Sequence, residues 1–404
     1  MSESLRNLST IEYGASPKEI RSNDSTAIGI YGTGGLVGSA IKPLFHGPLV
    51  VVARKGTLDK PLFITGDCWV IDTAYAVLPN ANVDAKWLYY NLLKYDLKKL
   101  NESTGVPSIS RDYLYRVTFE TYPLAEQRKI ARILSTVDAV IEKTEATIAK
   151  YKAIKSGMMR DLFSRGIDLK TVKLRPRYED APELYKQSEL GWVPKEWDIV
   201  RMDEILKSPV RDFGSFAMTN LITFEESGVI FIKSEMVQDG YIDFSRPYYI
   251  NDEVHKLLFK SMVFSGDILF TKIGAIGRVA TYDGRLGVCN SNAATAKIQV
   301  DKSRCDPDYI AYKLTSTRVI NEFNKSVIST PPRINLGDIN SLNIKLPKKY
   351  EQIDISNMIK SIINKTQLES LSLAKYQQLK TALMSDLLTG KVRVIYEEEK
   401  LEVI

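Results

Sequence analysis

The chain has 404 residues, of which 44% are hydrophobic and 26% charged, as in an ordinary soluble protein long enough for two domains. No apolar run reaches the roughly 20 residues that cross a bilayer, residues 1–7 lack a signal-peptide pattern, and Cys68, Cys289 and Cys305 are too far apart to suggest a disulfide framework. We therefore expect a cytoplasmic protein, and its net charge of +6 (55 basic and 49 acidic residues) is compatible with a polyanionic partner.

The first part of the chain, residues 1–122, is predicted to be an α+β domain. Short apolar runs bounded by turn residues indicate strands at 49–53, 63–64 and 74–78, and residues 86–100 are typical of a helix. Gly32-Thr33-Gly34-Gly35-Leu36-Val37-Gly38 resembles a dinucleotide-binding loop, but Pro43 and Pro48 interrupt the helix that such a loop requires. A glycine-rich turn is the favoured interpretation.

A long helix is predicted over residues 123–165. Its apolar positions advance by alternating steps of four and three, which is the 3.5-residue period of a coiled-coil seam. The seam positions are Ile130, Leu134, Val137, Ile141, Thr144, Ile148, Tyr151, Lys155, Met158 and Leu162. Residues 166–196 follow, with three prolines among many charges, and we expect them to form an exposed linker.

The second half of the chain repeats the first. Residues 197–346 are predicted to be a second α+β domain, with strands at 229–233, 267–272, 279–282 and 296–300 and a helix at 308–323. A second long helix is predicted over 347–390, followed by a tail over 391–404. Its seam would consist of Ile355, Ile359, Ile362, Thr366, Glu369, Leu373, Tyr376, Lys380, Leu383 and Leu387.

The two helices are copies of one another. A shift of 225 positions superposes residues 126–163 on 351–388 without a gap, and ten of the 38 positions are identical, Glu126/Glu351 and Gln127/Gln352 among them. Internal duplication favours an antiparallel pair, although each helix packing only on its own domain is the alternative. A helix of 38 residues spans roughly 57 Å at 1.5 Å per residue.

No catalytic or metal-binding constellation is predicted. Thr330-Pro331-Pro332-Arg333 lacks the polar and aromatic residues with which adenine methyltransferases hold a flipped base. The chain has no Gly-Lys-Ser/Thr phosphate loop, its two histidines, His46 and His255, are far apart, and the acids and lysine of residues 397–400 lie in a charged tail.

Basic residues on turns beside strands and glycines are the candidates for contact with DNA. Such side chains can hold phosphates, and arginine can bind guanine edges. Solvated surface turns are the alternative for each of them. The candidate DNA contacts are Lys42, Arg54, Lys55, Thr57, Arg111, Lys233, Lys272, Arg278 and Arg333.

Together, these features resemble the specificity subunit of a type I restriction–modification system. The most specific segments are Pro123-Leu124-Ala125-Glu126-Gln127-Arg128-Lys129-Ile130, Leu190-Gly191-Trp192-Val193-Pro194-Lys195-Glu196-Trp197 and Asp386-Leu387-Leu388-Thr389-Gly390-Lys391-Val392. Tyr31-Gly32-Thr33-Gly34-Gly35, Arg54-Lys55-Gly56 and Ile71-Asp72-Thr73-Ala74 are similar to one type of recognition domain.

The resemblance implies an α+β fold in which two target-recognition domains are separated by a pair of long antiparallel coiled-coil helices. Each domain would read one half of a split DNA target, and the helices would set the spacing. The implied partners are double-stranded DNA, two modification subunits that hold S-adenosylmethionine, and motor-nuclease restriction subunits. The chain itself would bind no cofactor.

The helices would also dock the modification subunits. The residues expected on the seam or the docking face are Glu126, Gln127, Ile130, Leu134, Val137, Ile141, Ile148, Tyr151, Met158, Leu162, Ile355, Ile359, Ile362, Leu373, Tyr376, Leu383 and Leu387. Two features depart from the family pattern. The first domain lacks the Gly-Trp-Val-Pro-Lys-Glu-Trp segment, and Ile353 and Asp354 stand where the first helix has Arg128 and Lys129.

The sequence therefore predicts a non-catalytic DNA-specificity subunit. A single-chain methyltransferase or nuclease with an unrecognised site is the first alternative, and binding of S-adenosylmethionine to the isolated chain would distinguish it. A scaffold whose helices join other proteins is the second, which sequence-specific DNA binding by the assembled complex would exclude.

Overall fold

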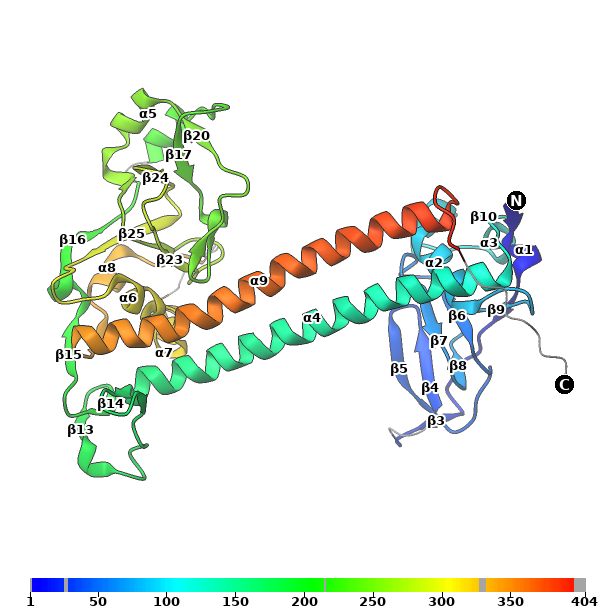
Figure 1. Ribbon diagram of the computed structural model, residues 1–404, viewed down its shortest axis with the longest axis horizontal. Helices are drawn as coiled ribbons and strands as arrows, with labels where there is room; N and C mark the ends of the chain where they lie inside the picture. The colour runs from blue at the N-terminus through cyan, green and yellow to red at the C-terminus, as the bar shows by residue number, and fades with distance from the viewer. Residues whose placement is uncertain (1, 25–27, 214–215, 327–331, 396–404) are drawn as a thin grey trace. The chain divides into compact units, whose positions relative to one another are not determined.

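The structure is a computed structural model that describes residues 2–24, 28–213, 216–326 and 332–395. It divides into two compact units (Figure 1). Unit 1 consists of Met1–Ala146 with Leu371–Ile404, and unit 2 consists of Thr147–Ser370. Each unit therefore contains one α+β domain and a part of each long helix. The predicted fold class is confirmed.

Two four-stranded sheets form the domain of unit 1. The first has the order β2-β9-β6-β7 and is antiparallel throughout, and the second has the order β3-β5-β4-β8, in which β4 and β8 are parallel. Their strands are β2 (Ser9–Tyr13), β3 (Arg21–Ser22), β4 (Ile28–Gly32), β5 (Gly35–Ala40), β6 (Leu49–Ala53), β7 (Leu62–Ile64), β8 (Cys68–Val70) and β9 (Ala74–Pro79). The three strands predicted from apolar runs correspond to β6, β7 and β9.

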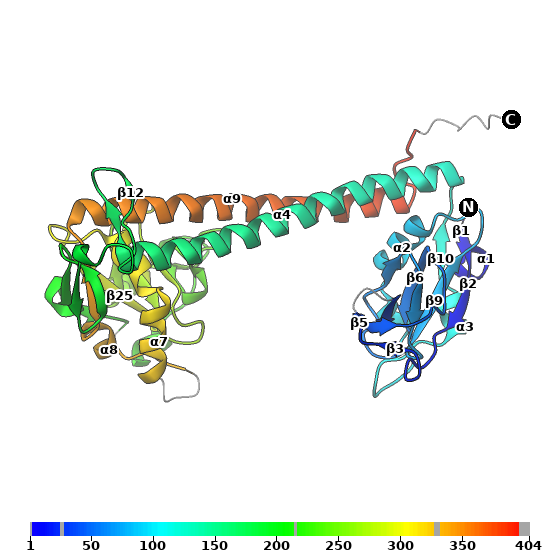
Figure 2. The ribbon, with the colours of Figure 1, turned by 90° about the horizontal axis from the view of Figure 1, so that it is seen from below.

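Helix α2 joins the first sheet of unit 1 to the long helices. Its buried face, with Trp87 and Leu88, shares one core with Val50 and Val77 of the sheet and with Leu134. Figure 2 shows α2 on the side of the sheet that faces the helices. The other elements of the unit are β1 (Ser2–Ser4), α1 (Leu5–Leu8), α2 (Ala85–Lys94), the 3-10 turn η1 (Leu97–Leu100), α3 (Arg111–Tyr115) and β10 (Thr118–Glu120).

Unit 2 also has two four-stranded sheets; the first repeats the strand order of unit 1, whereas in the second the parallel pair is central instead of at the edge. Its first sheet has the order β16-β25-β22-β23, and its second has the order β20-β17-β24-β21 with β17 and β24 parallel. The strands are β16 (Leu206–Arg211), β17 (Val229–Ile232), β20 (Tyr249–Ile250), β21 (Met262–Val263), β22 (Ile268–Thr271), β23 (Val279–Thr281), β24 (Cys289–Ser291) and β25 (Thr295–Val300). The four predicted strands of this domain match β17, β22, β23 and β25.

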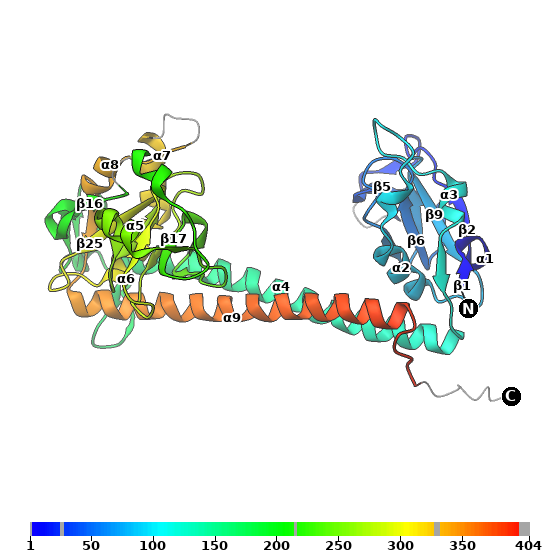
Figure 3. The ribbon, with the colours of Figure 1, turned by 90° about the horizontal axis from the view of Figure 1, so that it is seen from above.

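The helix predicted at 308–323 is two helices. It consists of α6 (Pro307–Leu314) and α7 (Thr317–Ser326), and the hydroxyl of Thr315 donates to the carbonyl of Tyr312 between them. Threonine and serine side chains compete with the backbone for helix hydrogen bonds, which explains the interruption. Helix α6 packs between the first sheet and the start of α9 (Figure 3).

Smaller elements complete unit 2. They are β15 (Asp198–Arg201) paired with β26 (Asn343–Leu346), β18 (Val237–Gln238) paired with β19 (Tyr241–Ile242), α5 (Asp252–Leu257), α8 (Leu336–Asn340) and the 3-10 turns η3 (Met202–Ile205), η4 (Phe216–Leu221), η5 (Ser234–Met236) and η6 (Phe259–Ser261).

The two long helices are α4 (Leu124–Arg165) and α9 (Lys349–Leu388). Within unit 1, Ile130 and Leu134 of α4 share a core with Leu387 near the end of α9. Within unit 2 the order is reversed, because Leu162 near the end of α4 shares a core with Ile355 of α9. The helices are therefore antiparallel within each unit.

The segment expected to be an exposed linker is more structured than its composition indicates. It contains two hairpins and the 3-10 turn η2, namely β11 (Ile167–Asp168) with β12 (Lys173–Leu174), η2 (Pro182–Leu184), and β13 (Tyr185–Ser188) with β14 (Gly191–Pro194). Arg175 and Val193 are buried within unit 2. Its prolines and charges lie mostly on the outside of the hairpins, so the composition alone suggests a linker.

Candidate nucleic-acid interface

Three turns of unit 1 meet at one end of its first sheet. The backbone N–H groups of Arg54 and Lys55 donate to the carbonyl of Thr73 at 2.9 and 3.0 Å. The N–H of Ile71 donates to the carbonyl of Tyr31 at 3.1 Å, which brings the end of the second sheet to the same place. The three segments that resemble a recognition domain are thus joined by hydrogen bonds.

Two arginines of this region lie over one exposed tyrosine. The guanidinium carbons of Arg54 and Arg111 are 5.3 and 4.9 Å from the ring centroid of Tyr13, whose exposed fraction is 46%. Arg54 also donates from Nη1 to the carbonyl of Asp72 at 3.2 Å. Together with Lys55, which is exposed, these residues form what we call the Tyr13 surface. It combines cations with an aromatic face, as nucleic-acid contacts often do.

The Tyr13 ring is supported from inside the domain. It packs edge-on against Tyr75, with a distance of 5.2 Å between ring centroids. Burial, followed by the proximity of Tyr13, raises the pKa of Tyr75 to about 12, so its hydroxyl keeps its proton. That hydroxyl donates to the carbonyl of Ile109 at 3.1 Å. The exposed Tyr13 ring therefore packs against a tyrosine that is held in place and uncharged.

The remaining candidates of unit 1 lie outside the Tyr13 surface as defined. Lys42 is exposed just after β5, in the second sheet, and Thr57 is exposed beyond Gly56. The glycine-rich segment is the turn of a hairpin, in which Gly32 pairs with Gly35 and the chain continues as strand β5. The interpretation as a glycine-rich turn is confirmed, because no helix follows it to hold a cofactor phosphate.

Unit 2 contains the same backbone arrangement with a different side chain. The N–H of Lys272 donates to the carbonyl of Ala294 at 2.9 Å, and the carbonyl of Lys272 accepts from Ile334, as that of Arg54 accepts from Ile109. Lys272 is therefore the counterpart of Arg54.

The prediction that Lys272 contacts DNA is wrong. Its exposed fraction is only 1%, and its ammonium group lies 3.0 Å from the carboxylate of Asp212, which follows β16. A buried ammonium that already has a carboxylate partner cannot reach a phosphate without losing both its pair and its packing.

Lys233 occupies a different part of unit 2. Its ammonium nitrogen lies 3.5 Å from the ring centroid of Tyr248 and 4.4 Å from that of Phe224, which is partly exposed. Lys233 directly follows Ile232, the last residue of β17 that pairs with the parallel strand β24. Gly32 has the matching position in unit 1, because it directly follows Tyr31, the last residue of β4 that pairs with β8. The lysine with its two rings gives unit 2 a cationic and aromatic surface of its own.

Two further candidates of unit 2 are accessible. Arg333 is exposed and its backbone forms an isolated bridge with Ile273. Arg278 is half-buried and lines a cavity beside α4. Thr330 and Pro331 of the motif at 330–333 lie outside the described residues.

The glutamine that is identical in both long helices connects each helix to its own domain. The side-chain carbonyl of Gln127 accepts from the N–H of Asp84, the residue before α2, at 2.8 Å, and its amide donates to the carbonyl of Tyr122. Gln352 makes the matching bonds with Asp306 and with the carbonyl of Pro347, each at 2.8 Å.

The neighbouring glutamates are paired with arginines. Glu126 accepts from Arg393, which follows α9, at 2.8 and 2.6 Å, and Glu351 accepts from Arg175, which follows α4. Both glutamates and both glutamines are buried. Glu126 and Gln127 were predicted on the seam or the docking face, and in the structure their side chains are instead engaged in contacts within the chain.

The predicted seam agrees better with the structure. Ile130, Leu134, Ile148, Leu162, Ile355, Ile359, Ile362 and Leu387 are buried, and Val137, Ile141, Tyr151, Met158, Leu373, Tyr376 and Leu383 are half-buried. Met159, Phe163, Ile363, Met384 and Leu388 are also buried. The period misses these because the buried face of each helix widens where it meets a domain.

The chain is similar in sequence and in fold to proteins of one known family. Residues 4–152 and 194–379 match the sequence model of the type I restriction modification DNA specificity domain. The chain belongs to this family. We refer to it below as the specificity family, and the resemblance inferred from the motifs is confirmed.

Individual members of the specificity family are moderately similar. The chain is 27% identical to the MjaVIII type I restriction enzyme specificity subunit of Methanocaldococcus jannaschii over 331 residues, which cover 78% of this chain and 72% of that protein. It is 23% identical to the EcoBI specificity subunit of Escherichia coli over 290 residues, which cover 69% and 58%. The solved type I restriction–modification S subunit from M. genitalium has the same fold, with a TM-score of 0.66, 12% identity and 96% coverage of each chain.

The described residues show neither a metal site nor a membrane-spanning helix. They contain no group of three or more His, Cys, Asp or Glu side chains arranged to hold a metal ion. None of the described helices is long and apolar enough to cross a membrane. His46 pairs with Asp67 at 2.7 Å on the surface, and the ring nitrogen of His255 contacts Asn290.

The aromatic members of both surfaces were missed by the sequence reasoning. Tyr13, Phe224 and Tyr248 lie at or near strand ends, and no local pattern separates them from core aromatics. Alternation along β2 would place Tyr13 on the same face as the buried Ile11, so the sequence offers no signal that Tyr13 is exposed. Only the tertiary contact shows that two arginines cover it.

Proposed function

We propose that this chain is a DNA-specificity subunit in which the domain of each unit reads one half of a two-part target. The family model that matches it is a DNA specificity domain, and it matches two segments, one in each half of the chain. The chain would have no catalytic role of its own. S-adenosylmethionine would bind to the modification subunits, and restriction subunits would add cleavage.

The Tyr13 surface is the observation that supports this proposal most directly. Arginine can donate two parallel hydrogen bonds to the O6 and N7 atoms of guanine, and lysine can neutralise a phosphate. Arg54 is oriented by the carbonyl of Asp72 and by the ring of Tyr13, so it would lose little freedom on binding. We infer that Arg54 reads a base and that Lys55 holds the backbone.

The corresponding surface of unit 2 differs in chemistry. Lys272 takes the place of Arg54 but is buried, and the half-buried Lys233 with Phe224 and Tyr248 provides the cation of the surface. Two domains of one fold that present different side chains at their surfaces would recognise different bases. The proposed target therefore has two unlike halves.

The docking of modification subunits would use the outer faces of the helices rather than the seam. Arg128 and Lys129 are exposed on α4, and Ile353 and Asp354 are exposed at the matching positions of α9. The two proposed docking faces consequently differ in charge, although each would receive one modification subunit.

Selection of bound sequences tests the proposal. The full chain, purified with a modification subunit of a type I system, is incubated with a pool of random duplexes, and the bound fraction is sequenced. We expect one bipartite sequence with two unlike, separated halves. A single continuous motif, or methylation of DNA by the chain without its partner, would contradict the proposed function.

Lengthening both helices should change the spacing of the target. We expect that one heptad inserted at Lys143 and one at the matching position Leu368 adds about three base pairs to the spacer, because seven helical residues rise roughly 10 Å and preserve the seam period. Both half-sites should stay the same. The control carries seven extra residues after the exposed Glu179, outside both helices. An unchanged spacer in the helix variant contradicts the role of the helices.

A further inference from the structure

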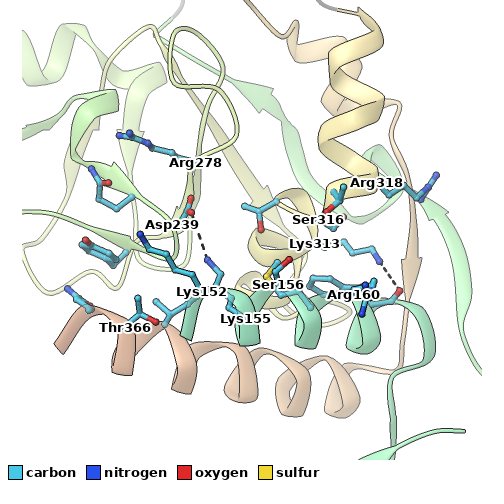
Figure 4. A pocket seen from close by; sticks show the side chains of 18 of the residues that line it. Lys152, Lys155, Ser156, Arg160, Asp239, Arg278, Lys313, Ser316, Arg318 and Thr366 are labelled. Atoms are coloured by element: carbon cyan, nitrogen blue, oxygen red, sulfur yellow. Dashed lines mark hydrogen bonds and ion pairs between the residues drawn. The ribbon is translucent and has the colours of Figure 1, made fainter. Parts of the chain in front are cut away.

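A cavity of about 1070 Å³ opens in unit 2 beside the C-terminal part of α4, the middle of α9 and the connection between α6 and α7 (Figure 4). We call it the basic cavity. The cationic side chains that line it are Lys152, Lys155, Arg160, Arg278, Lys313, Arg318 and Lys345, and the lining contains one carboxylate, that of Asp239.

Two lysines of the basic cavity are almost completely buried. Lys313 is 4% exposed and Lys345 is 8% exposed. Each donates a hydrogen bond to one backbone carbonyl, Lys313 to Phe163 at 3.3 Å and Lys345 to Trp192 at 3.0 Å. Within the described part of the chain neither forms an ion pair with a carboxylate. An ammonium group can donate three hydrogen bonds, so both retain donors for a ligand.

This cluster of cations is unfavourable by itself. Burial, and then the charges of Lys345 and Arg318, lower the pKa of Lys313 well below its ordinary value. Burial, and then the charge of Arg318, lower the pKa of Lys345 to about 8. Buried charges are usually paired, and an anion between these groups would remove the mutual repulsion.

A polar group at the start of α7 faces the same space. Figure 4 shows Ser316 beside Lys313, and its hydroxyl is buried without a hydrogen bond in the described structure. Ser316 directly precedes α7, whose first turn leaves backbone N–H groups without partners inside the helix. An unsatisfied hydroxyl, buried ammonium groups and a helix start therefore converge.

The internal repeat shows that the fold does not need these charges. The matching positions in unit 1 follow from the shift of 225 for the long helices and for β26 with β10, and from a shift of 222 between the capping residues Asp306 and Asp84. The counterparts of Lys152, Arg160, Lys313, Arg318 and Lys345 are Gln377, Ser385, Asn91, Asp96 and Glu120. Lys155 is retained as Lys380, and each has a carboxylate partner, Asp239 at 3.9 Å for Lys155 and Asp138 at 2.6 Å for Lys380.

We propose that the basic cavity binds a free polyphosphate anion of nucleotide size. Its volume lies near the upper end of the range for small-molecule sites. The backbone of a DNA duplex could contact the exposed rim, at Lys152 and Arg160, but could not reach Lys313 and Lys345 at the floor. Met159 and the half-buried Tyr241 also line the cavity and supply an apolar wall for the non-phosphate part of a ligand.

Calorimetry of the full chain with sodium tripolyphosphate, and with ATP without magnesium, tests this proposal. We expect one site per chain at fixed ionic strength, with sulfate binding more weakly. The variant Lys155→Gln should lower the affinity about ten- to a hundredfold, as expected for a lost charge-assisted hydrogen bond. Its control is Lys380→Gln at the matching position of unit 1, which should bind as the original chain does.

Proton uptake gives a second readout without a mutation. The number of protons taken up on anion binding at pH 8 should be greater than zero, because a bound anion would raise the lowered pKa values of Lys345 and Lys313. Titrations in two buffers with different ionisation enthalpies measure this number. The other charged or titratable groups that line the cavity are Lys152, Lys155, Arg160, Asp239, Tyr241, Arg278 and Arg318.

Several outcomes would overturn the proposal. These are absence of binding by either probe, equal losses in Lys155→Gln and Lys380→Gln, or displacement of tripolyphosphate by duplex DNA together with weaker DNA binding by Lys155→Gln. The last outcome would make the cavity a subsite for DNA phosphates. If Lys155→Gln does not fold, the exposed double variant Lys152→Gln with Arg160→Gln replaces it, and an unchanged affinity for tripolyphosphate would count against the proposal.

Discussion

Replacing Arg175 by alanine should lower the free energy of unfolding of unit 2 by about 3–5 kcal/mol, the usual loss when one partner of a buried ion pair is removed. Glu351, the partner, is 1% exposed. It accepts hydrogen bonds from Arg175, from the indole nitrogen of Trp197 at 3.1 Å and from the N–H of Ile167 at 2.9 Å. Alanine would leave a buried carboxylate without its counter-charge.

Arg175 stays protonated and positively charged in the folded protein. Burial lowers its pKa, but hydrogen bonding with Glu351 and the charge of that carboxylate outweigh burial and leave the pKa raised. The loss on mutation should therefore be the same throughout the neutral pH range. Urea unfolding followed by tryptophan fluorescence measures it, because Trp197 is part of the contact.

Unit 1 supplies the matched control. Arg393 binds Glu126 in the same manner, but 63% of its side chain is exposed. Water can replace much of the contact there, so Arg393→Ala should cost clearly less than Arg175→Ala. Equal losses in the two variants, or an unchanged stability of unit 2 in Arg175→Ala, would contradict the assignment of Arg175 and Glu351 as a buried pair that stabilises the unit.

The parts of the fold that could be predicted are those that produce a local pattern in the sequence. Strands such as β6 and β9 are continuous apolar runs, and the seam of α4 repeats every 3.5 residues, so both are visible in one pass along the chain. The duplication is also visible, since identical residues recur at one fixed shift. These features made the two α+β domains and the two long helices predictable.

Contacts between distant segments were not predictable in this way. Arg175 lies in a segment of prolines and charges that favours an exposed linker, yet it pairs with a residue 176 positions later. Lys272 stands at a basic turn that looks like Arg54 in sequence, and only the position of Asp212 shows that it is buried and paired. Identity between the repeats marked Glu126 and Gln127 as important without showing that their contacts are internal.

The role of Arg54 at the proposed DNA interface also depends on contacts with segments distant in the sequence. Replacing Arg54 by alanine should reduce discrimination at the first half of the target by about 1–3 kcal/mol, which is the range for a side chain that binds a base edge. Affinity for the second half should be unchanged. Arg54 stands over Tyr13 and donates to the carbonyl of Asp72, so the two contacts that hold it are independent of DNA. Binding of the full complex to duplexes that vary at each position measures the loss.

Lys55→Ala is the matched variant for this prediction. Lys55 is next to Arg54 in the chain, its side chain is exposed, and no ring orients it in the described structure. A phosphate contact carries no base information, so its loss should weaken binding to all sequences alike and reduce the dependence of affinity on salt concentration. A uniform loss in Arg54→Ala would assign Arg54 to the backbone as well. Arg111, the other arginine that lies over the Tyr13 ring, would then be the residue of unit 1 that reads a base.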